Sequence, residues 1–146
     1  MSLEKTKQWF EQAIPAPTMR DKRVQLGCHF EEFGEMLQSI GYEGTPELRM
    51  VNFESDWFKG KHSIWTDRQE DMITNCNKEA LLDSLVDQIV TAVGVGHMMG
   101  MDVLGALDEI NRSNFSKFED GKPVFDANGK ITKGKDYVKP NLEKFV

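Results

Sequence analysis

Residues 18–41 read TMRDKRVQLGCHFEEFGEMLQSIG, and this stretch decides the fold class. Thr18 is a good N-cap, because its hydroxyl can accept a hydrogen bond from a free backbone amide in the first turn of a helix. Gly41 supplies a stop at the other end. The sequence therefore predicts a long amphipathic helix from Met19 to about Ile40. Its apolar positions recur at steps of three and four residues, at Val24, Leu26, Phe30, Phe33, Leu37 and Ile40.

Two shorter helices are predicted around this one. Residues 3–13 have an amphipathic pattern that ends at the prolines of segment 14–17, where helix is disfavoured. Thr45 is followed by a proline, which suits the first turn of a helix, so we expect a short helix over 46–58. From there to Asn77 the pattern is poor, and we expect a loop.

Asn77 is the expected cap of a further long helix, which runs through apolar or small residues to Met99. Because apolar residues surround it, we expect this helix to be buried on most sides. Gly100 ends it, and residues 102–117 have the pattern of another amphipathic helix. An Asn-Gly pair inside 124–131 indicates a small hairpin. The predicted fold class is all-α, of the four-helix-bundle type, with a short C-terminal β-ribbon and loop tail.

Composition limits the function classes. The 146 residues are enough for one domain, which we expect to span 1–146. The formal net charge of −6 argues against a nucleic-acid partner, because such binding rests on cations that neutralise phosphates. No apolar run reaches the length of a membrane span and no signal peptide is visible, so we expect no membrane partner and a cytoplasmic protein. Cys28 and Cys76 are far apart and form no CxxC unit, which suits a reducing compartment.

Three carboxylates in the first long helix form an E-E-x-x-E pattern: Glu31, Glu32 and Glu35. At about 100° per residue they fall within roughly 100° of arc, so they can converge on one point. The stripe through Glu31 and Glu35 continues as Val24, Cys28, Gln38 and Tyr42, a mixed and largely apolar or small set that is unlike a solvated, salt-bridged face.

A second acidic stripe lies in the helix after Asn77, where Glu79, Asp83 and Asp87 recur every four residues. Ionised carboxylates that are buried together need a compensating cation, and an all-oxygen set suits a hard ion such as Mg²⁺ or Mn²⁺. Solvent-facing acids on charged helices are the alternative. The residues alone leave these two interpretations about equal.

The order of motifs resembles the phosphoribosyl-ATP pyrophosphohydrolase-like and MazG-like superfamily of all-α nucleotide pyrophosphohydrolases. The resemblance covers most of the chain from about Met19 onward, and the compact form is similar to phage-encoded members. It rests on HFEEFGEM at 29–36, DSLVD at 83–87, DEINRSNFSK at 108–117, GKP at 121–123 and the segment 133–140.

The resemblance implies a set of metal ligands and a Mg²⁺ cofactor, with Mn²⁺ as a possible substitute. The implied carboxylates are Glu31, Glu32, Glu35 and Asp87, and Glu32 or Glu35 would also orient or deprotonate the attacking water. Many members have Glu-x-x-Asp as the second motif, whereas this chain has Ser84 three positions before Asp87. The remaining ligand is then Asp83 or Glu79, and Asp83 is our choice.

Positive side chains near the end of the last helix and in the tail are the expected phosphate clamp. They are Arg112, Lys117, Lys122 and Lys133, with solubility an equally good explanation of Lys122 and also of Lys130. Asn114 can hydrogen-bond a base or sugar, and Tyr137 can stack on a base. The alternative for both side chains is that they anchor the tail.

The function that the resemblance implies is metal-dependent hydrolysis of a nucleoside or deoxynucleoside triphosphate to the monophosphate and pyrophosphate. One alternative is phosphoribosyl-ATP pyrophosphohydrolase, which acts in histidine biosynthesis. The other is a non-catalytic acidic helical interaction protein. Aromatic residues in a bundle of this size also suggest a homo-oligomer, either a dimer or a tetramer.

Overall fold

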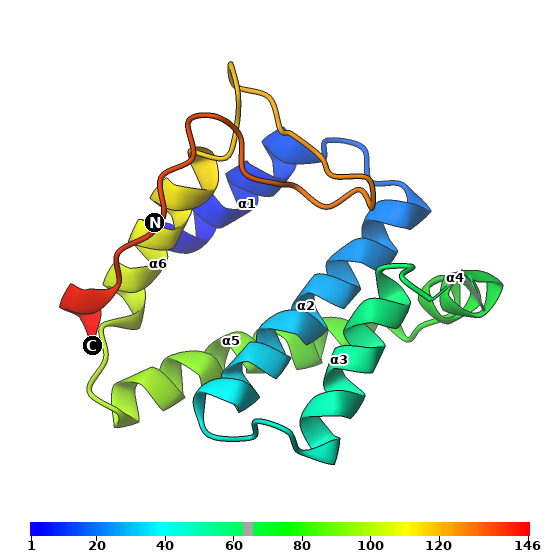
Figure 1. Ribbon diagram of the computed structural model, residues 1–146, viewed down its shortest axis with the longest axis horizontal. Helices are drawn as coiled ribbons and strands as arrows, with labels where there is room; N and C mark the ends of the chain where they lie inside the picture. Colours follow the sequence, from blue (N-terminus) through cyan, green and yellow to red (C-terminus); the bar gives the residue numbers. More distant parts are fainter. Residues whose placement is uncertain (63–65) are drawn as a thin grey trace. The chain divides into compact units, whose positions relative to one another are not determined.

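The computed structural model describes residues 1–62 and 66–146, and it confirms an all-α fold. Within that part of the chain there is no β-strand. The contacts divide the chain into two compact units, which are described separately: 16–75 with 125–130, and 1–15 with 76–124 and 131–146. Helices pack mainly in pairs within each unit, so the four-helix bundle is not confirmed (Figure 1). The single domain over 1–146 stays a prediction.

The first unit is built on α2 (Met19–Ser39) and α3 (Pro46–Phe58), which lie side by side (Figure 1). Both predicted starts are confirmed. Thr18 and Asp21 form a reciprocal capping box on α2, and the Thr45 hydroxyl accepts a hydrogen bond from the Leu48 amide of α3. The predicted end of α2 is also close, since the helix stops at Ser39 and Gly41 follows with a φ of +104°.

Glycines on α2 allow α3 to approach closely. A Cβ atom on Gly27 would lie 2.7 Å from the Ser55 carbonyl oxygen and 2.7 Å from Cγ of Lys59. The Ser55 hydroxyl also donates a hydrogen bond of 2.8 Å to the Gly27 carbonyl oxygen, in a buried position. One turn along α2, the Phe30 ring stacks on Phe58 at 5.8 Å between ring centres. The small Gly27 thus brings the end of α3 against the middle of α2.

The loop expected between the 46–58 helix and Asn77 is wrong in part, because α4 (Thr66–Thr74) is helical. Residues 63–65 of that expected loop lie outside the described residues. Gln69 of α4 is only 1% exposed. Its amide donates to the Trp57 carbonyl oxygen and its side-chain oxygen accepts from Arg23 at 3.1 Å. This buried amide attaches α4 to both α2 and the end of α3.

The second unit contains α1 (Ser2–Ala13) and α6 (Val103–Phe115) side by side, as both Figure 1 and the contacts show. Its core consists of Trp9, Ala13 and Phe118, and Trp9 stacks on Phe118 at 5.8 Å. Asn111 is 2% exposed and accepts a hydrogen bond of 2.9 Å from the Thr6 hydroxyl. The predicted helix at 102–117 is therefore confirmed in a slightly shorter form, and Asp102 is its N-cap.

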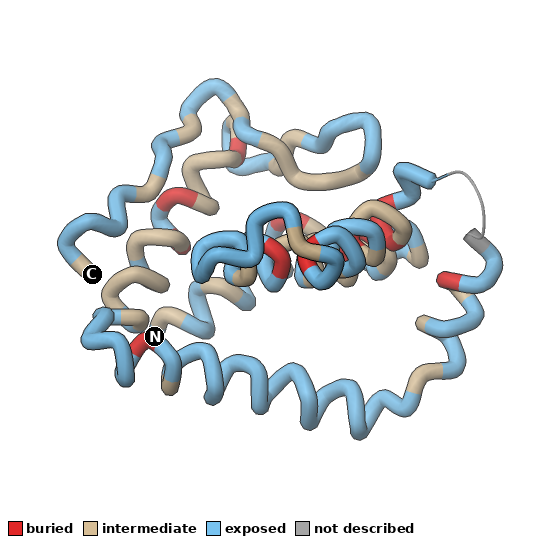
Figure 2. Tube along the Cα trace, turned by 60° about the horizontal axis from the view of Figure 1, so that its bottom comes forward, coloured by how far each residue is buried: buried red, intermediate tan, exposed pale blue. Residues whose placement is uncertain are grey.

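The helix after Asn77 is confirmed as α5 (Lys78–Met98), but its predicted burial is wrong. Every residue from 77 to 93 is exposed (Figure 2). Within its own unit α5 contacts α6 near Gly96, which is buried against Val103. Apolar composition predicts that a helix is covered, but it does not say whether the covering element belongs to the same chain.

The predicted β-ribbon is not confirmed, because its turn forms without flanking strands in the described residues. The Asp126 amide donates to the Lys130 carbonyl oxygen, and Gly129 has a positive φ of 80°. The last helical turn of the chain is a 3₁₀ segment, Glu143–Phe145.

No single helix in the described part of the chain is both long and apolar enough to span a membrane. Helices α5 and α6 meet that criterion only when taken together, and they are bent by 118° at the break between them.

Candidate functional site

Glu31, one of the predicted metal ligands, lies between two lysines. Lys59, the residue that follows α3, places its ammonium 2.8 Å from Oε1 of Glu31. The Lys130 ammonium lies 2.7 Å from Oε2. The Lys59 side chain is 5% exposed, whereas the Glu31 carboxylate side chain is 31% exposed. Both carboxylate oxygens are thus paired, and two positive charges share one negative charge.

Glu31, Lys59 and Lys130 form a triad in which the surroundings favour the ionised side chains of Glu31 and Lys130. Burial raises the pKa of the Glu31 carboxyl, but hydrogen bonds from Lys130 and Lys59 outweigh it, so the pKa lies below its ordinary value. Burial lowers the pKa of Lys130, and the hydrogen bond to Glu31 reverses that effect, so the pKa is raised. Both groups are therefore charged near neutral pH.

The turn at 126–130 positions Lys130. An oxygen of the Asp126 side chain accepts hydrogen bonds from the backbone amides of Asn128 at 2.8 Å and Lys130 at 3.0 Å. Arg20 of α2 donates a hydrogen bond of 2.6 Å to the Ala127 carbonyl oxygen. These contacts hold the tip of the turn against α2, which is why the Lys130 ammonium reaches Glu31.

A cavity of about 180 Å³ opens beside the triad. It is smaller than a typical site for a whole small molecule, and its size suits one polar group of a larger ligand. Three lysines and two carboxylates face it, and one of these lysines, Lys61, is paired with Asp56 at 2.6 Å. The residues around it are Val24, Glu31, Lys59, Lys61, Asp126, Asn128 and Lys130.

The other predicted carboxylates are exposed, and the charge of Glu32 contributes to the raised pKa of Lys130. Glu32 and Glu35 are exposed on α2, and Asp83 and Asp87 are exposed on α5, in the other unit. In the described residues no three His, Cys, Asp or Glu side chains are grouped closely enough to hold a metal ion. The set of metal ligands stays a prediction, and both carboxylate oxygens of Glu31 are paired with lysines.

Arg112 of the predicted phosphate clamp is held by a neighbouring carboxylate. Its Nε and Nη2 atoms donate to Glu109 at 2.8 and 2.7 Å, and Nη2 also donates to the Lys139 carbonyl oxygen. Glu109 accepts a further hydrogen bond from the Asn141 amide at 2.9 Å. The hydrogen bonds from Arg112 and Asn141 lower the pKa of Glu109 to about 2. In this arrangement Arg112 attaches the tail to α6, and its role toward phosphate stays a prediction.

The remaining predicted clamp residues gather where the tail folds back on the end of α6. The Lys117 ammonium lies 5.7 Å from the ring centre of Trp9, and the Lys133 ammonium lies 5.0 Å from that of Tyr137. The Gly134 amide donates a hydrogen bond to the Lys117 carbonyl oxygen. This contact brings the segment that carries Lys133 next to Lys117. Asn114 contributes its backbone carbonyl to the Trp9 indole, and Lys122 is exposed.

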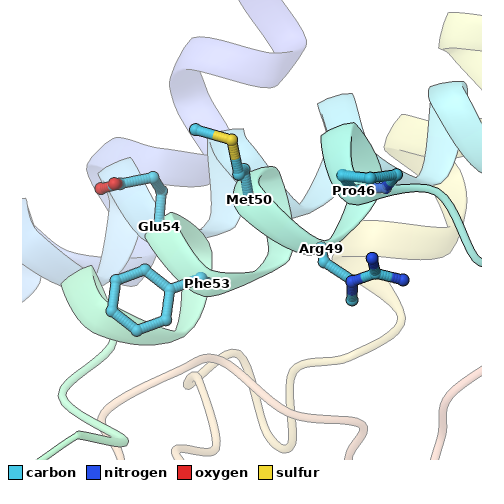
Figure 3. A pocket seen from close by; sticks show the side chains of 5 residues that line it. All are labelled: Pro46, Arg49, Met50, Phe53 and Glu54. Carbon is cyan, nitrogen blue, oxygen red and sulfur yellow. The ribbon is translucent and has the colours of Figure 1, made fainter.

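A second hollow, of about 340 Å³, lies on α3 (Figure 3). All its lining residues come from one side of that helix, and most of the lining is apolar. They are Pro46, Arg49, Met50, Phe53 and Glu54. None of the predicted catalytic, metal-binding or substrate-binding residues is among them.

Sequence patterns assign no role to two residues of the triad. Lys59 lies outside every motif, and Lys130 has solubility as its simplest explanation. The available signal for Lys59 is Gly27, because a glycine inside a helix indicates a close approach by another element. Nothing in the sequence indicates that Lys59 is that element.

Cys28 and Cys76 are free and half-buried, and burial raises the pKa of the Cys28 thiol. A raised thiol pKa leaves little reactive thiolate, as expected for an inert cysteine.

Comparison with known proteins gives no relative: no protein-family model, curated protein or solved structure matches this chain.

Proposed function

We propose that the protein hydrolyses a nucleoside or deoxynucleoside triphosphate to the monophosphate and pyrophosphate, with Mg²⁺ as cofactor. The observation that carries the proposal is the joint placement of Glu31, Lys59 and Lys130 at a small cavity lined by charged side chains. A triphosphate needs ammonium groups for its oxygens, and α2 presents two further carboxylates within one turn of Glu31.

In the reaction, water attacks the α-phosphorus. The bond from the α-phosphorus to the oxygen that bridges the α- and β-phosphates breaks, so pyrophosphate leaves. Bound Mg²⁺ would neutralise part of the phosphate charge. Glu32 or Glu35 is the proposed base that takes a proton from the attacking water, because both are exposed on the same helix as Glu31. Lys59 and Lys130 are the proposed contacts for phosphate oxygens.

The other parts of the proposal follow from the resemblance. Glu31, Glu32, Glu35, Asp83 and Asp87 are the proposed oxygen ligands, although the described residues show no grouping of three. Mg²⁺ in proteins is commonly held by one or two carboxylates together with substrate phosphates, so a complete protein cage is not required. We also propose a cytoplasmic homo-oligomer without a nucleic-acid or membrane partner.

A non-catalytic interaction protein is the second candidate, and the exposure of α5 favours it. A large exposed apolar surface on a helix marks a contact with another protein. In that case the two lysines at Glu31 have a purely structural task.

Pyrophosphate release tests the proposal. The panel comprises nucleoside and deoxynucleoside triphosphates and phosphoribosyl-ATP, with Mg²⁺, Mn²⁺ or a chelator. We expect metal-dependent release from some members of the panel, and loss of release in Glu35→Gln and Asp87→Asn with the helical content unchanged. Release from phosphoribosyl-ATP alone would instead select the histidine-biosynthesis alternative.

Glu47→Gln is the matched control, because this exposed glutamate lies in the first turn of α3, at the opposite end from Lys59. It removes one carboxylate without touching the cavity. Full turnover in Glu35→Gln, or silence of the wild type across the panel, would contradict the proposed function.

A further inference from the structure

Helix α5 carries an apolar surface that its own unit leaves open. Seven large aliphatic residues between 81 and 93 are exposed, from Leu85 at 37% to Leu82 at 63%. Together they present on the order of 600 Å² of apolar surface, at the upper end for the largest patch on a monomer. They are Leu81, Leu82, Leu85, Val86, Ile89, Val90 and Val93.

The apolar residues of α5 form one seam. At about 100° per residue, Leu82, Leu85, Ile89 and Ala92 follow each other at steps of three and four, which is the spacing of a coiled-coil contact. Leu81, Val86 and Val93 flank this seam on its two sides. The seam ends at Gly96, where α6 already covers the helix.

The acidic residues of α5 avoid the seam. Glu79, Asp83 and Asp87 lie outside its line of contact, and all three are in the N-terminal portion of the helix. The C-terminal portion from Val90 has a single titratable residue, His97. Two copies of α5 that run antiparallel would therefore place Glu79 and Asp83 beside the partner's neutral C-terminal portion, whereas a parallel pair would place acids beside acids along the whole acidic portion.

A lipid surface fits this helix poorly. Helices that lie on membranes are rich in lysine and arginine on the polar face, and α5 has only Lys78. The formal net charge of −6 would also oppose approach to anionic lipid. A second copy of the chain matches the seam in length and chemistry, and the exposed area is close to the about 800 Å² that each partner contributes to a standard interface.

We propose that α5 pairs with α5 of a second copy, antiparallel and about a two-fold axis, with Leu82 of one chain beside the partner's Ala92. This inference names the surface through which the chain forms a homo-oligomer. The pairing does not rest on metal binding or hydrolysis, so it is independent of the proposed activity.

The mass in solution tests the pairing. For a chain of 16.7 kDa, light scattering after size exclusion should give the mass of two or four chains at tens of micromolar. Ile89→Glu puts a charge on the seam and should lower the mass to a single chain or half the wild-type assembly. Ser84→Glu adds the same charge on the other side of α5 and should leave the mass unchanged.

Circular dichroism accompanies both variants, because an unfolded variant would also lose its partner. Ile89 is 47% exposed within the chain, so we expect Ile89→Glu to keep its helical content. A monomeric wild type would overturn the proposal, and so would an Ile89→Glu variant that keeps the wild-type mass. Binding of a monomeric wild type to phosphatidylserine vesicles would assign α5 to lipid instead.

Disulfide cross-linking tests the direction of the pair. In a background with Cys28→Ser and Cys76→Ser, the double variant Leu82→Cys with Ala92→Cys should give a covalent dimer on oxidation. The two positions are about 15 Å apart along one helix, too far for a bond within one chain. Leu82→Cys alone should remain uncoupled. Efficient coupling of this single variant would show a parallel pair and overturn the antiparallel arrangement.

Discussion

The ammonium of Lys59 lies 2.8 Å from Oε1 of Glu31, and almost the whole Lys59 side chain is buried. Its stem packs where Gly27 leaves room, so the ion pair depends on the close contact of α2 with α3. Lys130 is far more exposed and reaches the other oxygen of the same carboxylate. One carboxylate is therefore held by a buried cation and by a solvated one.

Replacement of each lysine by methionine should have unequal effects on stability. Lys59→Met removes a buried partner and should lower the free energy of unfolding by about 2 kcal/mol, less than for a fully buried pair because Lys130 remains. Lys130→Met should cost under about 1 kcal/mol, since the Lys130 side chain is 42% exposed. Urea denaturation measures both values. Equal losses would contradict the asymmetric burial.

Glu31 should make stability depend on acid pH. Its pKa in the folded protein is below the ordinary 4.5, so its contribution is complete above about that pH. The contribution is lost as pH falls through the lowered folded-state pKa. The stability difference between wild type and Glu31→Gln should therefore shrink on acidification below pH 4.5. If the stability difference grew on acidification, the pKa of Glu31 in the folded protein would be raised and not lowered.

Two glycine-to-alanine replacements should change the stability of the protein in opposite directions. Gly27→Ala places a methyl group against the Ser55 carbonyl oxygen and should lower stability by about 1–3 kcal/mol. A methyl group on Gly94 of α5 would meet no atom within 4 Å, so Gly94→Ala should raise stability by about 0.5–1 kcal/mol. Thermal unfolding of both variants checks this pair, and a stabilised Gly27→Ala would refute the close packing.

The role of Arg112 can be separated from that of its partner. If Arg112 only attaches the tail, Arg112→Met and Glu109→Gln should lower stability alike and leave pyrophosphate release similar. A phosphate contact predicts loss of turnover or a raised KM in Arg112→Met alone. We expect the first result, because both guanidinium atoms that face Glu109 are already paired. Parallel kinetics and urea denaturation decide between the two.

Helix positions were largely predictable from the sequence, because caps and stops are local. Thr18, Thr45 and Asn77 each mark a helix start that the structure confirms. The missed helix α4 owes its place to the buried amide of Gln69, whose partners are distant in the sequence. A polar residue that is buried through such contacts leaves no hydrophobic pattern to find.

The candidate site was predictable only in part. Glu31 is half-buried, as its place beside Val24 and Cys28 predicts, whereas Glu35 on the same stripe is exposed. The two lysine partners of Glu31 come from the end of α3 and from a turn 99 residues later. Periodicity within one helix cannot identify such partners. The burial predicted for α5 was wrong for a different reason. Apolar residues indicate that a helix surface is buried, but the element that buries it can belong to the same chain or to a second chain.

The hydrogen bond between Thr6 and Asn111 joins residues 105 positions apart. At a synthesis rate of about 5–20 residues per second, α6 is therefore made about 5–20 s after α1, and the two helices cannot pack before then. The contact of Gly27 with Ser55 spans only 28 positions, so α2 and α3 can pack while synthesis continues. Trp9 of α1 consequently stays without its packing partner Phe118 until most of the chain has been made.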